Sequence, residues 1–449
     1  MTIWIIAAEV FFSLLILFFA WFAITSLMEK ESRAFGRSLF FLLAFLAVGA
    51  CFLLFRFPLK TWLFGFVAVL AGIFLLWLLL SPTPNKSLEV IGEQKKIDER
   101  DVIFARFDHE EGSPVTQNYY KRRPEFAFID KEIRELPDLL TPAHLEKEPI
   151  LFSFADSEFD FLEQLLTLVQ GKRNPERVRL SEKQNTRIIK SLIKYLGSDL
   201  CGVCPLDQAY VYSHVGRGPE VYGKEIKLDH KYAIVFAVEM DGALVSSAPK
   251  APVIVETAKK YVEAAKISII TASFIRRLGY PARAHIAGSN YQCVLPPLGW
   301  EAGLGEMGRL GILITTEYGP QVRLGLITTD LPLIPDEKKI SGIQDFCEKC
   351  QKCARNCPAQ AISYGDKKEE NGSLRWILDR EKCYRYWRKA GTDCAVCISV
   401  CPFSKPHNPF HDFIRKLAST SSSAQTLSVW GDDLFYGRIP SRKKSPLSF

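Results

Sequence analysis

The first 80 residues of this 449-residue chain are poor in charge, although the whole chain is not. They hold five Lys or Arg and three Glu, out of 57 basic and 50 acidic residues. The chain also lacks a dense Lys/Arg tract, and its net charge of +7 is too small to indicate a nucleic-acid partner. An aromatic content of 12% excludes disorder for most of the chain. The charge-poor first 80 residues argue against an entirely soluble protein. A polytopic transporter is not expected either, because most of the chain follows this apolar part.

The lack of charge comes from three apolar runs: Ile3–Leu27, Ser38–Phe55 and Thr61–Leu80. Each is long enough for a helix across roughly 30 Å of hydrocarbon, so residues 1–81 are predicted to form a three-helix membrane anchor. A cleaved signal peptide would need a basic segment before the first run and a small-residue cleavage site after it, and both are missing. Glu9 alone interrupts the first run, and an interfacial residue is a simpler interpretation than a proton relay.

Basic residues are distributed unevenly around these runs. The 28–37 loop and the segment after Leu80 hold most of them, whereas the loop between the second and third runs has only Arg56 and Lys60. By the positive-inside rule, three spans in the cell (inner) membrane would leave the large C-terminal part facing the cytoplasm. No histidine precedes His109, which excludes a bis-histidine haem within the spans.

An alternating pattern of helices and strands begins near residue 186, after a charged linker. We expect helices at Thr186–Leu196 and Val253–Leu278 and strands at Ala209–Ser213, Tyr232–Val238, Ala282–Ile286 and Gly311–Thr315. The pattern is that of an α+β or α/β fold, and α+β is the fold class we predict. Residues 186–340 form the predicted catalytic domain, and residues 82–185 form the linker and the N-terminal part of the catalytic unit.

Two short motifs in this domain allow more than one interpretation. Cys201 and Cys204 have the spacing of a redox or metal motif, but no second pair lies nearby, which favours small buried residues. The run Gly303-Leu-Gly305-Glu-Met-Gly308-Arg-Leu-Gly311 is neither a Walker loop nor a dinucleotide-binding turn. Its glycines indicate backbone that lies close either to a cofactor or to another segment of the chain.

Eight of the 12 cysteines form two ferredoxin-type runs. The first is Cys347-x2-Cys350-x2-Cys353-x3-Cys357-Pro358, and the second is Cys383-x10-Cys394-x2-Cys397-x3-Cys401-Pro402. Crossed ligation predicts two [4Fe–4S] clusters, one on Cys347, Cys350, Cys353 and Cys401 and the other on Cys357, Cys383, Cys394 and Cys397. Zinc would not require two such runs. We therefore predict a two-cluster bacterial ferredoxin domain at 341–405, one-electron transfer and a reducing compartment, with Cys51, Cys201, Cys204 and Cys293 outside the ligand set.

Several longer motifs point to a known family. They are Phe274-Ile-Arg-Arg-Leu-Gly-Tyr280, Ala302-Gly-Leu-Gly-Glu-Met-Gly-Arg309, Glu317-Tyr-Gly-Pro-Gln-Val-Arg323, Thr329-Asp-Leu-Pro-Leu333, Trp430-Gly-Asp-Asp-Leu-Phe435 and the two cysteine runs. From about residue 190 onward the chain resembles the corrinoid- and iron–sulfur-dependent reductive dehalogenases. The resemblance implies a nitroreductase-like corrinoid-binding domain, the ferredoxin domain and, at 406–449, a C-terminal tail packing on the catalytic unit. It also implies that cob(I)alamin, fed by the two clusters, replaces a halogen of a small organohalide by hydrogen.

The resemblance assigns roles to individual residues. Tyr261 would supply the proton, Arg323 would stabilise the tyrosine anion, and Asn290 would donate to a halide or another polar substrate atom. Residue type alone also allows a helix-surface tyrosine, a solvated arginine and a turn-forming asparagine. Corrinoid contacts are expected at Gly303, Gly305, Gly308, Arg309 and Gly311. Because the chain has no Asp-x-His-x-x-Gly motif, a base-off corrinoid (cobalamin) without a protein ligand is expected.

The chain departs from the family pattern in three ways. It shows no twin-arginine export signal, since Arg122-Arg123 is internal. The segment Asn290-Tyr-Gln-Cys293 replaces the Asn-Asp-Thr-Ala often found there, so an altered substrate pocket is expected. No reductase module is fused, so electrons are expected from a separate ferredoxin, flavoprotein or quinol-linked donor. The alternatives are a corrinoid/iron–sulfur reductase of a non-halogenated substrate, as in epoxyqueuosine reductase, and a membrane-bound ferredoxin-type electron-transfer protein.

Overall fold

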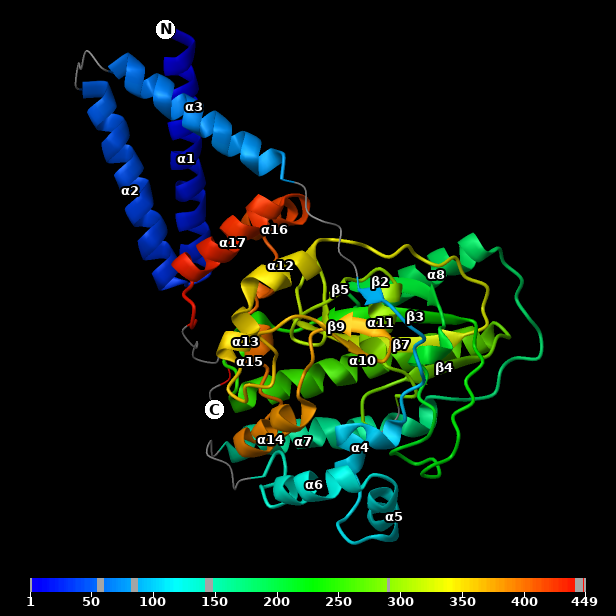
Figure 1. The fold of residues 1–449 in the computed structure, drawn as a ribbon. Coiled ribbons are helices and arrows are strands. Elements are labelled where there is room, and N and C mark those ends of the chain that lie inside the picture. Colours follow the sequence, from blue (N-terminus) through cyan, green and yellow to red (C-terminus); the bar gives the residue numbers. More distant parts are fainter. Residues whose placement is uncertain are drawn as a thin grey trace. The chain divides into compact units, whose positions relative to one another are not determined.

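The computed structural model describes residues 2–54, 60–81, 88–141, 148–288, 291–440 and 447. The chain divides into two compact units, which we describe separately (Figure 1). Unit 1 comprises Met1–Asn85, Asp345–Cys350 and Pro406–Ser441. Unit 2 comprises Lys86–Gln344, Gln351–Lys405 and Arg442–Phe449.

Unit 1 contains the apolar helices α1 (Thr2–Met28), α2 (Ser32–Leu54) and α3 (Lys60–Leu79). Among the described residues, two stretches are long and apolar enough to cross a membrane, Glu9–Met28 and Ser32–Ala50. In α3 the apolar stretch is shorter, Gly65–Leu78. Two of the three predicted spans are therefore supported, and the third stays a prediction.

The C-terminal helices α16 (Pro409–Thr420) and α17 (Ser422–Phe435) also lie in unit 1. Phe410 of α16 stacks on Phe22 of α1 with ring centroids 4.7 Å apart, and Phe435 of α17 meets the same ring edge-on at 4.7 Å. Figure 1 shows α17 at the end of the α1–α2 pair. The aromatic residues of these two helices pack against aromatic residues of α1 and α2. Farther along the tail, Leu447 packs beside Leu151 and Phe152 of unit 2. Packing of the whole tail on the catalytic unit stays a prediction.

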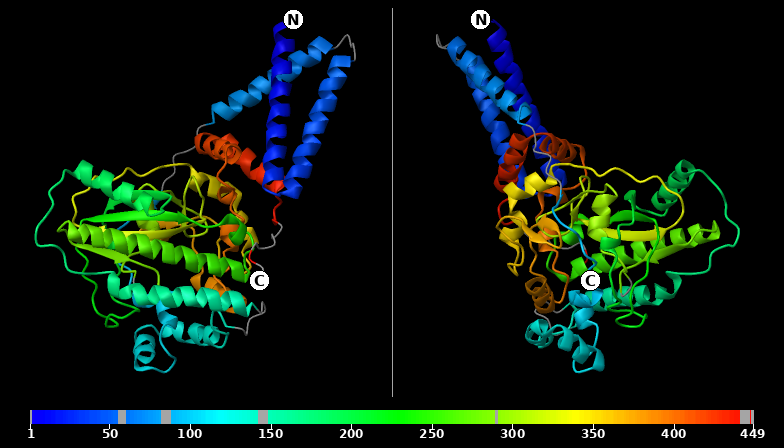
Figure 2. Two further views of the ribbon diagram at one scale, coloured as in Figure 1. Left: turned by 180° about the vertical axis from the view of Figure 1, so that it is seen from behind. Right: turned by 45° about the vertical axis from the view of Figure 1, so that its right-hand side comes forward.

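Unit 2 is built on a four-stranded sheet in the order β2 (Leu200–Pro205), β3 (Tyr232–Glu239), β7 (Val322–Thr329) and β4 (Ala282–His285). All three pairings are antiparallel, which agrees with the α+β prediction. The long helix α10 (Ala251–Arg277) lies along one face, with α7 (Pro149–Gln164) against its outer side (Figure 2). Side chains alternate along β3, so that Phe236 packs on the α10 side and Val235 on the opposite side.

The remaining elements belong to unit 2, except that most of α12 belongs to unit 1. They are β1 (Glu89–Val90), α4 (Ile103–Phe107), α5 (Pro114–Arg122), α6 (Ala127–Arg134), α8 (Glu182–Tyr195), α9 (Gly242–Val245), α11 (Leu295–Glu301), β5 (Glu306–Met307), β6 (Leu313–Ile314), α12 (Ile343–Cys350), α13 (Lys352–Asn356), β8 (Lys368–Glu370), β9 (Ser373–Arg375), α14 (Arg380–Ala390) and α15 (Val396–Ser399). Short 3-10 turns occur at Glu99–Asp101, Pro124–Phe126, Leu165–Leu168, Gln208–Tyr210 and Pro402–Ser404.

Sequence periodicity predicts some of these elements and misses others. Helices α8 and α10 and strands β3 and β4 lie close to their predicted positions. The predicted strand Ala209–Ser213 is wrong, because a 3-10 turn occupies Gln208–Tyr210 and only an isolated bridge joins Val211 to Cys293. Strand β7 was not predicted at all. Its Gly325 weakens the strand pattern, yet any side chain there would collide with the Phe236 ring of the neighbouring strand.

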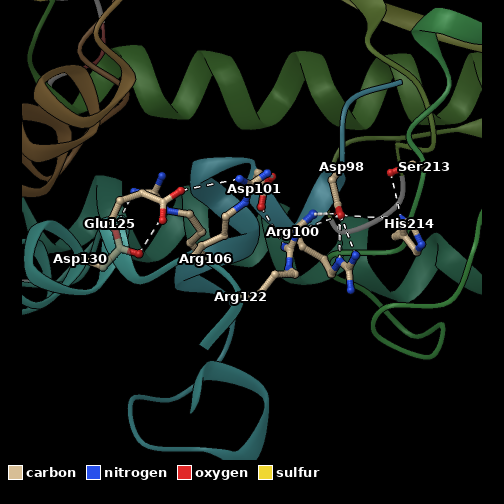
Figure 3. Close-up of polar contacts among 10 residues, drawn as sticks. Asp98, Arg100, Asp101, Arg106, Arg122, Glu125, Asp130, Ser213 and His214 are labelled. Atoms are coloured by element: carbon tan, nitrogen blue, oxygen red, sulfur yellow. Dashed lines mark hydrogen bonds and ion pairs between the residues drawn. The ribbon is translucent and has the colours of Figure 1, made fainter. Parts of the chain in front are cut away.

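An ion-pair network joins the N-terminal part of unit 2 to its core (Figure 3). Arg122 contacts Asp98 at 3.2 Å and Asp101 at 2.8 Å, and Arg123 contacts Asp101 at 2.6 Å. Asp98 lies 3.7 Å from His214 of the core as well. The internal Arg122-Arg123 pair is thus part of the folded unit, where it holds the 98–101 turn in place.

Candidate functional site

Tyr261 and Thr257 lie one turn apart on α10 and so share one face of this helix. Proline stands in the first turn of α10, where it is tolerated because its missing N–H has no partner there in any case. The helix ends before Gly279, whose φ of +88° favours glycine. Tyr261 is half-buried at the edge of the apolar core on this side of the sheet.

Arg323 on β7 reaches the same face of α10. One of its nitrogens, Nη2, donates to Thr257 Oγ1 at 2.5 Å and to Asp393 Oδ2 at 2.7 Å. Its guanidinium carbon lies 5.0 Å from the centroid of the Tyr261 ring, within the range of a cation–π contact. The structure therefore brings together Tyr261 and Arg323, which come from segments far apart in the sequence.

Charge on Arg323 is stabilised by its surroundings. Burial alone would lower the pKa of Arg323, but Tyr261, Asp393 and Tyr291 raise it above its usual value. Burial raises the pKa of Asp393, and the Arg323 charge opposes this effect. Because the side chains are only 15% and 7% exposed, the pair is a nearly dry ion pair.

A second tyrosine, Tyr291, lies beside this pair. Burial raises the pKa of Tyr291, Tyr261 raises it further, and Arg323 lowers it. Its hydroxyl donates to the Leu324 carbonyl at 3.5 Å. Asn290, the third predicted catalytic residue, lies outside the described residues, so its expected contact with the substrate stays a prediction.

Two polar atoms at this site are buried without a hydrogen-bond partner in the described part of the chain. They are Arg323 Nε, a donor, and Asp393 Oδ1, an acceptor. Buried polar groups in folded proteins are almost always paired, so these two unpaired atoms beside Tyr261 leave room for a hydrogen-bonding partner. Both atoms fit the expectation of a cofactor or substrate beside Tyr261.

The four cysteines expected to hold the second cluster lie together in unit 2. Burial raises the pKa of Cys397 well above its usual range, and Cys394, Cys383, Cys353 and Cys357 raise it further. Such mutual effects require neighbouring sulfurs. Cys394 and Ala395 have φ of 62° and 52°, a left-handed turn that bends the loop between α14 and α15. A backbone amide, Ala361 N–H, also donates to Cys357 Sγ at 3.3 Å.

The cysteines expected to hold the first cluster are divided between the units. Cys347 and Cys350 lie one turn apart on α12, and both are buried in unit 1. Cys353 and Cys401 are buried in unit 2. Within the described ranges, no three His, Cys, Asp or Glu side chains gather closely enough for a single metal ion. A cubane would bind each thiolate through a different iron.

The glycine-rich run is explained mainly by packing within the chain. A side chain at Gly305 would collide with the Ile314 carbonyl, and one at Gly308 with the Ile314 side chain. At Gly303 it would collide with the Glu337 carbonyl. At Gly311, with φ of +83°, it would press against Leu378. Of the two interpretations that the sequence leaves open, a neighbouring segment of chain accounts for these glycines.

Arg309, in the same run, is also held by the chain itself. Its Nη1 donates to the Ser363 and Gly365 carbonyls at 2.8 and 3.1 Å, and its guanidinium lies over the Trp376 ring. A cavity of about 420 Å³ opens beside Gly303. Its other lining residues are Leu200, Cys201, Ala302, Leu304, Glu317, Asp336, Glu337, Lys338 and Lys339. Among the predicted corrinoid contacts, only Gly303 lines this cavity.

Cys201 and Cys204 occupy opposite faces of β2. Cys201 packs with the core on the α10 side, whereas Cys204 lies in the core on the other side. Burial raises the pKa of each thiol to about 12. Two thiols on opposite faces of a strand cannot bind the same ion, so they act as small apolar side chains.

Comparisons with known proteins agree with the predicted resemblance. A family model described as a 4Fe-4S dicluster domain matches residues 346–405. The tetrachloroethene reductive dehalogenase of Sulfurospirillum multivorans is 31% identical over 287 residues, which cover 56% of this chain and 57% of that protein. The tetrachloroethene reductive dehalogenase of Desulfitobacterium hafniense is 31% identical over 282 residues, which cover 52% of this chain and 51% of that protein. The chain thus spans about half the length of these curated relatives.

Solved structures give the same result for the fold. The catabolic reductive dehalogenase NpRdhA, in complex with 3-bromo-4-hydroxybenzoic acid, has a TM-score of 0.65 at 24% identity, over 80% of this chain and 49% of that one. A reductive dehalogenase studied for B12-dependent dehalogenation has a TM-score of 0.65 at 26% identity, with the same coverage. An epoxyqueuosine reductase from Listeria monocytogenes is 30% identical, but only over 24% of this chain and 29% of that protein. The resemblance to reductive dehalogenases is therefore confirmed.

Two residues of the site were not predicted from the sequence. Thr257 could have been found, because it lies four residues before Tyr261 and therefore on the same helix face. Asp393 carried no such signal. It lies beside Cys394 in the ferredoxin part, and only the tertiary structure brings it to Arg323.

Proposed function

We propose that this chain is a membrane-anchored reductive dehalogenase that replaces a halogen of a small organohalide by hydrogen. The observation that carries the proposal is the Arg323 guanidinium beside the Tyr261 ring, in a chain similar to reductive dehalogenases. The match covers about half of each relative, and the proposal extends to the substrate class.

In the proposed reaction Tyr261 delivers the proton that the carbon centre takes up. A tyrosine is normally a weak acid near neutral pH, and a nearby positive charge favours its anion. Arg323 lies where it stabilises the anion left on Tyr261 once the proton has gone. The burial of Arg323 strengthens this effect, because the surrounding dielectric is low.

A corrinoid, when bound, would supply the strongly reducing cobalt that breaks the carbon–halogen bond. We propose that it lies next to Tyr261, where Arg323 Nε and Asp393 Oδ1 offer a free donor and acceptor within the described residues. A base-off state is consistent with the missing Asp-x-His-x-x-Gly motif. We propose Gly303 as the contact from the glycine-rich run, since it lines the cavity. Packing within the chain accounts for Gly305, Gly308, Arg309 and Gly311.

We further propose two [4Fe–4S] clusters with the crossed ligand sets given above. The matched dicluster domain contains all eight cysteines of these sets. Such clusters would supply electrons one at a time from a separate donor. The mutual effect of Cys397 with Cys357, Cys383 and Cys394 supports the second set, and Cys353 of the first set acts on the same thiol.

The membrane anchor is proposed to have three crossings. The turn between α1 and α2 meets α16 through a polar contact of 3.0 Å between Glu29 and His411. The far end of α3 meets the start of α17, where Ser421 Oγ donates to the Leu78 carbonyl at 2.5 Å. Within unit 1, α2 therefore runs away from the α16–α17 pair, and α3 runs back to that pair. A return of this kind supports three spans, with the catalytic part on the cytoplasmic side.

Cofactor content and halide release together test this function. Anaerobically purified protein should contain about eight iron atoms per chain, as two [4Fe–4S] clusters require, together with corrinoid. Reduced viologen should then support halide release from organohalides. Iron without corrinoid would instead indicate an electron-transfer protein, and corrinoid without halide release a reductase of another substrate.

A further inference from the structure

The loop between α14 and α15 connects the ferredoxin part to the active site. Thr392 Oγ1 donates to the Pro249 carbonyl, just before α10, at 2.6 Å. The Cys394 N–H donates back to Thr392 Oγ1 at 3.2 Å. Asp393 lies between these two anchored residues, so its backbone is fixed relative to both α10 and the proposed cluster ligand Cys394.

The Asp393 carboxylate accepts two short hydrogen bonds through one oxygen. Thr257 Oγ1 donates at 2.6 Å, and Arg323 Nη2 donates at 2.7 Å. Arg323 Nη2 also lies 2.5 Å from Thr257 Oγ1, so the three side chains form a closed triangle. Since the hydroxyl proton goes to Asp393, Thr257 accepts from Arg323.

The triangle engages only one nitrogen of Arg323. The long arginine side chain has many rotamers, and a fixed carboxylate selects among them. The rotamer seen in the structure places the Arg323 guanidinium over the Tyr261 ring. Without the Asp393 carboxylate, Arg323 would have only the Thr257 hydroxyl as a hydrogen-bond acceptor within the triangle.

We propose that Asp393 is a positioning residue, which holds Arg323 against Tyr261 and so ties the catalytic pair to the loop that carries Cys394. This inference rests on the proposed dehalogenase function. The Asp393→Asn variant keeps the shape but removes the charge. Its kcat should fall by about 10- to 100-fold, as when an outer partner that orients a site ligand is lost, while KM changes little.

Non-additivity gives the sharpest test. If Asp393 acts through Arg323, adding Asp393→Asn to an Arg323→Gln enzyme should cost almost no further activity. The same pair should also show a coupling in thermal unfolding, which requires no turnover. Thr257→Val should lower kcat as well, whereas Thr257→Ser, which keeps the hydroxyl, should restore it.

A buried ion pair elsewhere in unit 2 provides the control. Arg106 and Asp130, both labelled in Figure 3, lie 2.5 Å apart and are almost fully buried. Asp130→Asn should lower the unfolding temperature but leave the kcat of folded enzyme unchanged. The iron content and cluster EPR spectra of Asp393→Asn should match those of the wild type.

The possible outcomes distinguish the two proposals. Additive losses of kcat from Asp393→Asn and Arg323→Gln in an active enzyme would overturn the role of Asp393 alone. Lost iron or altered cluster spectra in Asp393→Asn would overturn it too, because the residue would then support the cluster. Wild-type protein loaded with both cofactors that releases no halide would overturn the dehalogenase function itself.

Discussion

Phe22 of α1 and Phe410 of α16 stack with only 7° between their rings, although they come from opposite ends of the chain. Phe22 lies within the apolar stretch Glu9–Met28, about two turns from its end. The C-terminal helices therefore pack against α1 at the level of its apolar stretch. In the proposed membrane topology, these helices belong to the membrane interface.

Removing this contact should destabilise unit 1. Phe410→Ala deletes a ring that is 4% exposed, and such truncations cost about 3–5 kcal/mol. Phe413, on the same helix, is 47% exposed, so Phe413→Ala should have a much smaller effect. Thermal unfolding of both variants in detergent measures the difference, and equal losses would contradict the packing.

Tyr261→Phe should abolish turnover. The substitution removes only the hydroxyl, so the ring remains next to Arg323 and the fold should be kept. Halide release should fall to background, while the iron and corrinoid contents stay at wild-type values. Tyr195→Phe is the matched control, because Tyr195 is 87% exposed. A Tyr261→Phe enzyme with unchanged rates would remove this residue from the mechanism.

Cys397→Ser should remove one cluster. Four cysteines act on its thiol, Cys353 and the three others of the proposed second set. Loss of the second cluster should lower the iron content by about four atoms per chain. Cys204→Ser should leave the iron content unchanged, since Cys204 packs in the core beside the sheet. Iron analysis and EPR spectroscopy of the reduced proteins measure both outcomes. Iron loss from Cys204→Ser would place that cysteine among the ligands.

Glu158 on α7 should make unit 2 less stable at alkaline pH. Burial raises the pKa of Glu158 to about 7, and Glu256 and Glu263 act in the same direction against Lys259. The folded-state pKa of Glu158 is higher than its pKa in an unfolded chain, so ionising Glu158 costs folding free energy. This cost is absent below about pH 4.3, grows as the pH rises and is complete above about pH 7.

The Glu158→Gln variant checks this sign. It should raise the unfolding temperature at pH 8 by about 2–4 °C, which corresponds to roughly 1 kcal/mol for a unit of this size. The effect is no larger because solvent near the half-buried carboxyl group reduces the cost of its charge. At pH 4.5 the gain should largely disappear. Glu182→Gln, at the exposed start of α8, is the control. A gain that does not depend on pH would contradict the assignment.

Local patterns in the sequence determined much of this protein. The cysteine spacing predicted a ferredoxin part, and the matched dicluster domain agrees. The hydrophobic pattern predicted α10 and β3, because the residues that decide these elements lie within a few turns of one another. The family motifs led to Tyr261 and Arg323 before their contact was known.

The tertiary structure alone decided which distant residues meet. Strand β7 was missed because Gly325 weakens its sequence pattern, and the reason for this glycine is the Phe236 ring on the neighbouring strand, which leaves no room for a side chain. Asp393 reaches Arg323 because the loop between α14 and α15 is fixed to the start of α10. The C-terminal helices join α1 through rings such as Phe410 and Phe22. Each of these contacts depends on the shape of a surface made by remote segments, which periodicity and spacing along one segment do not encode.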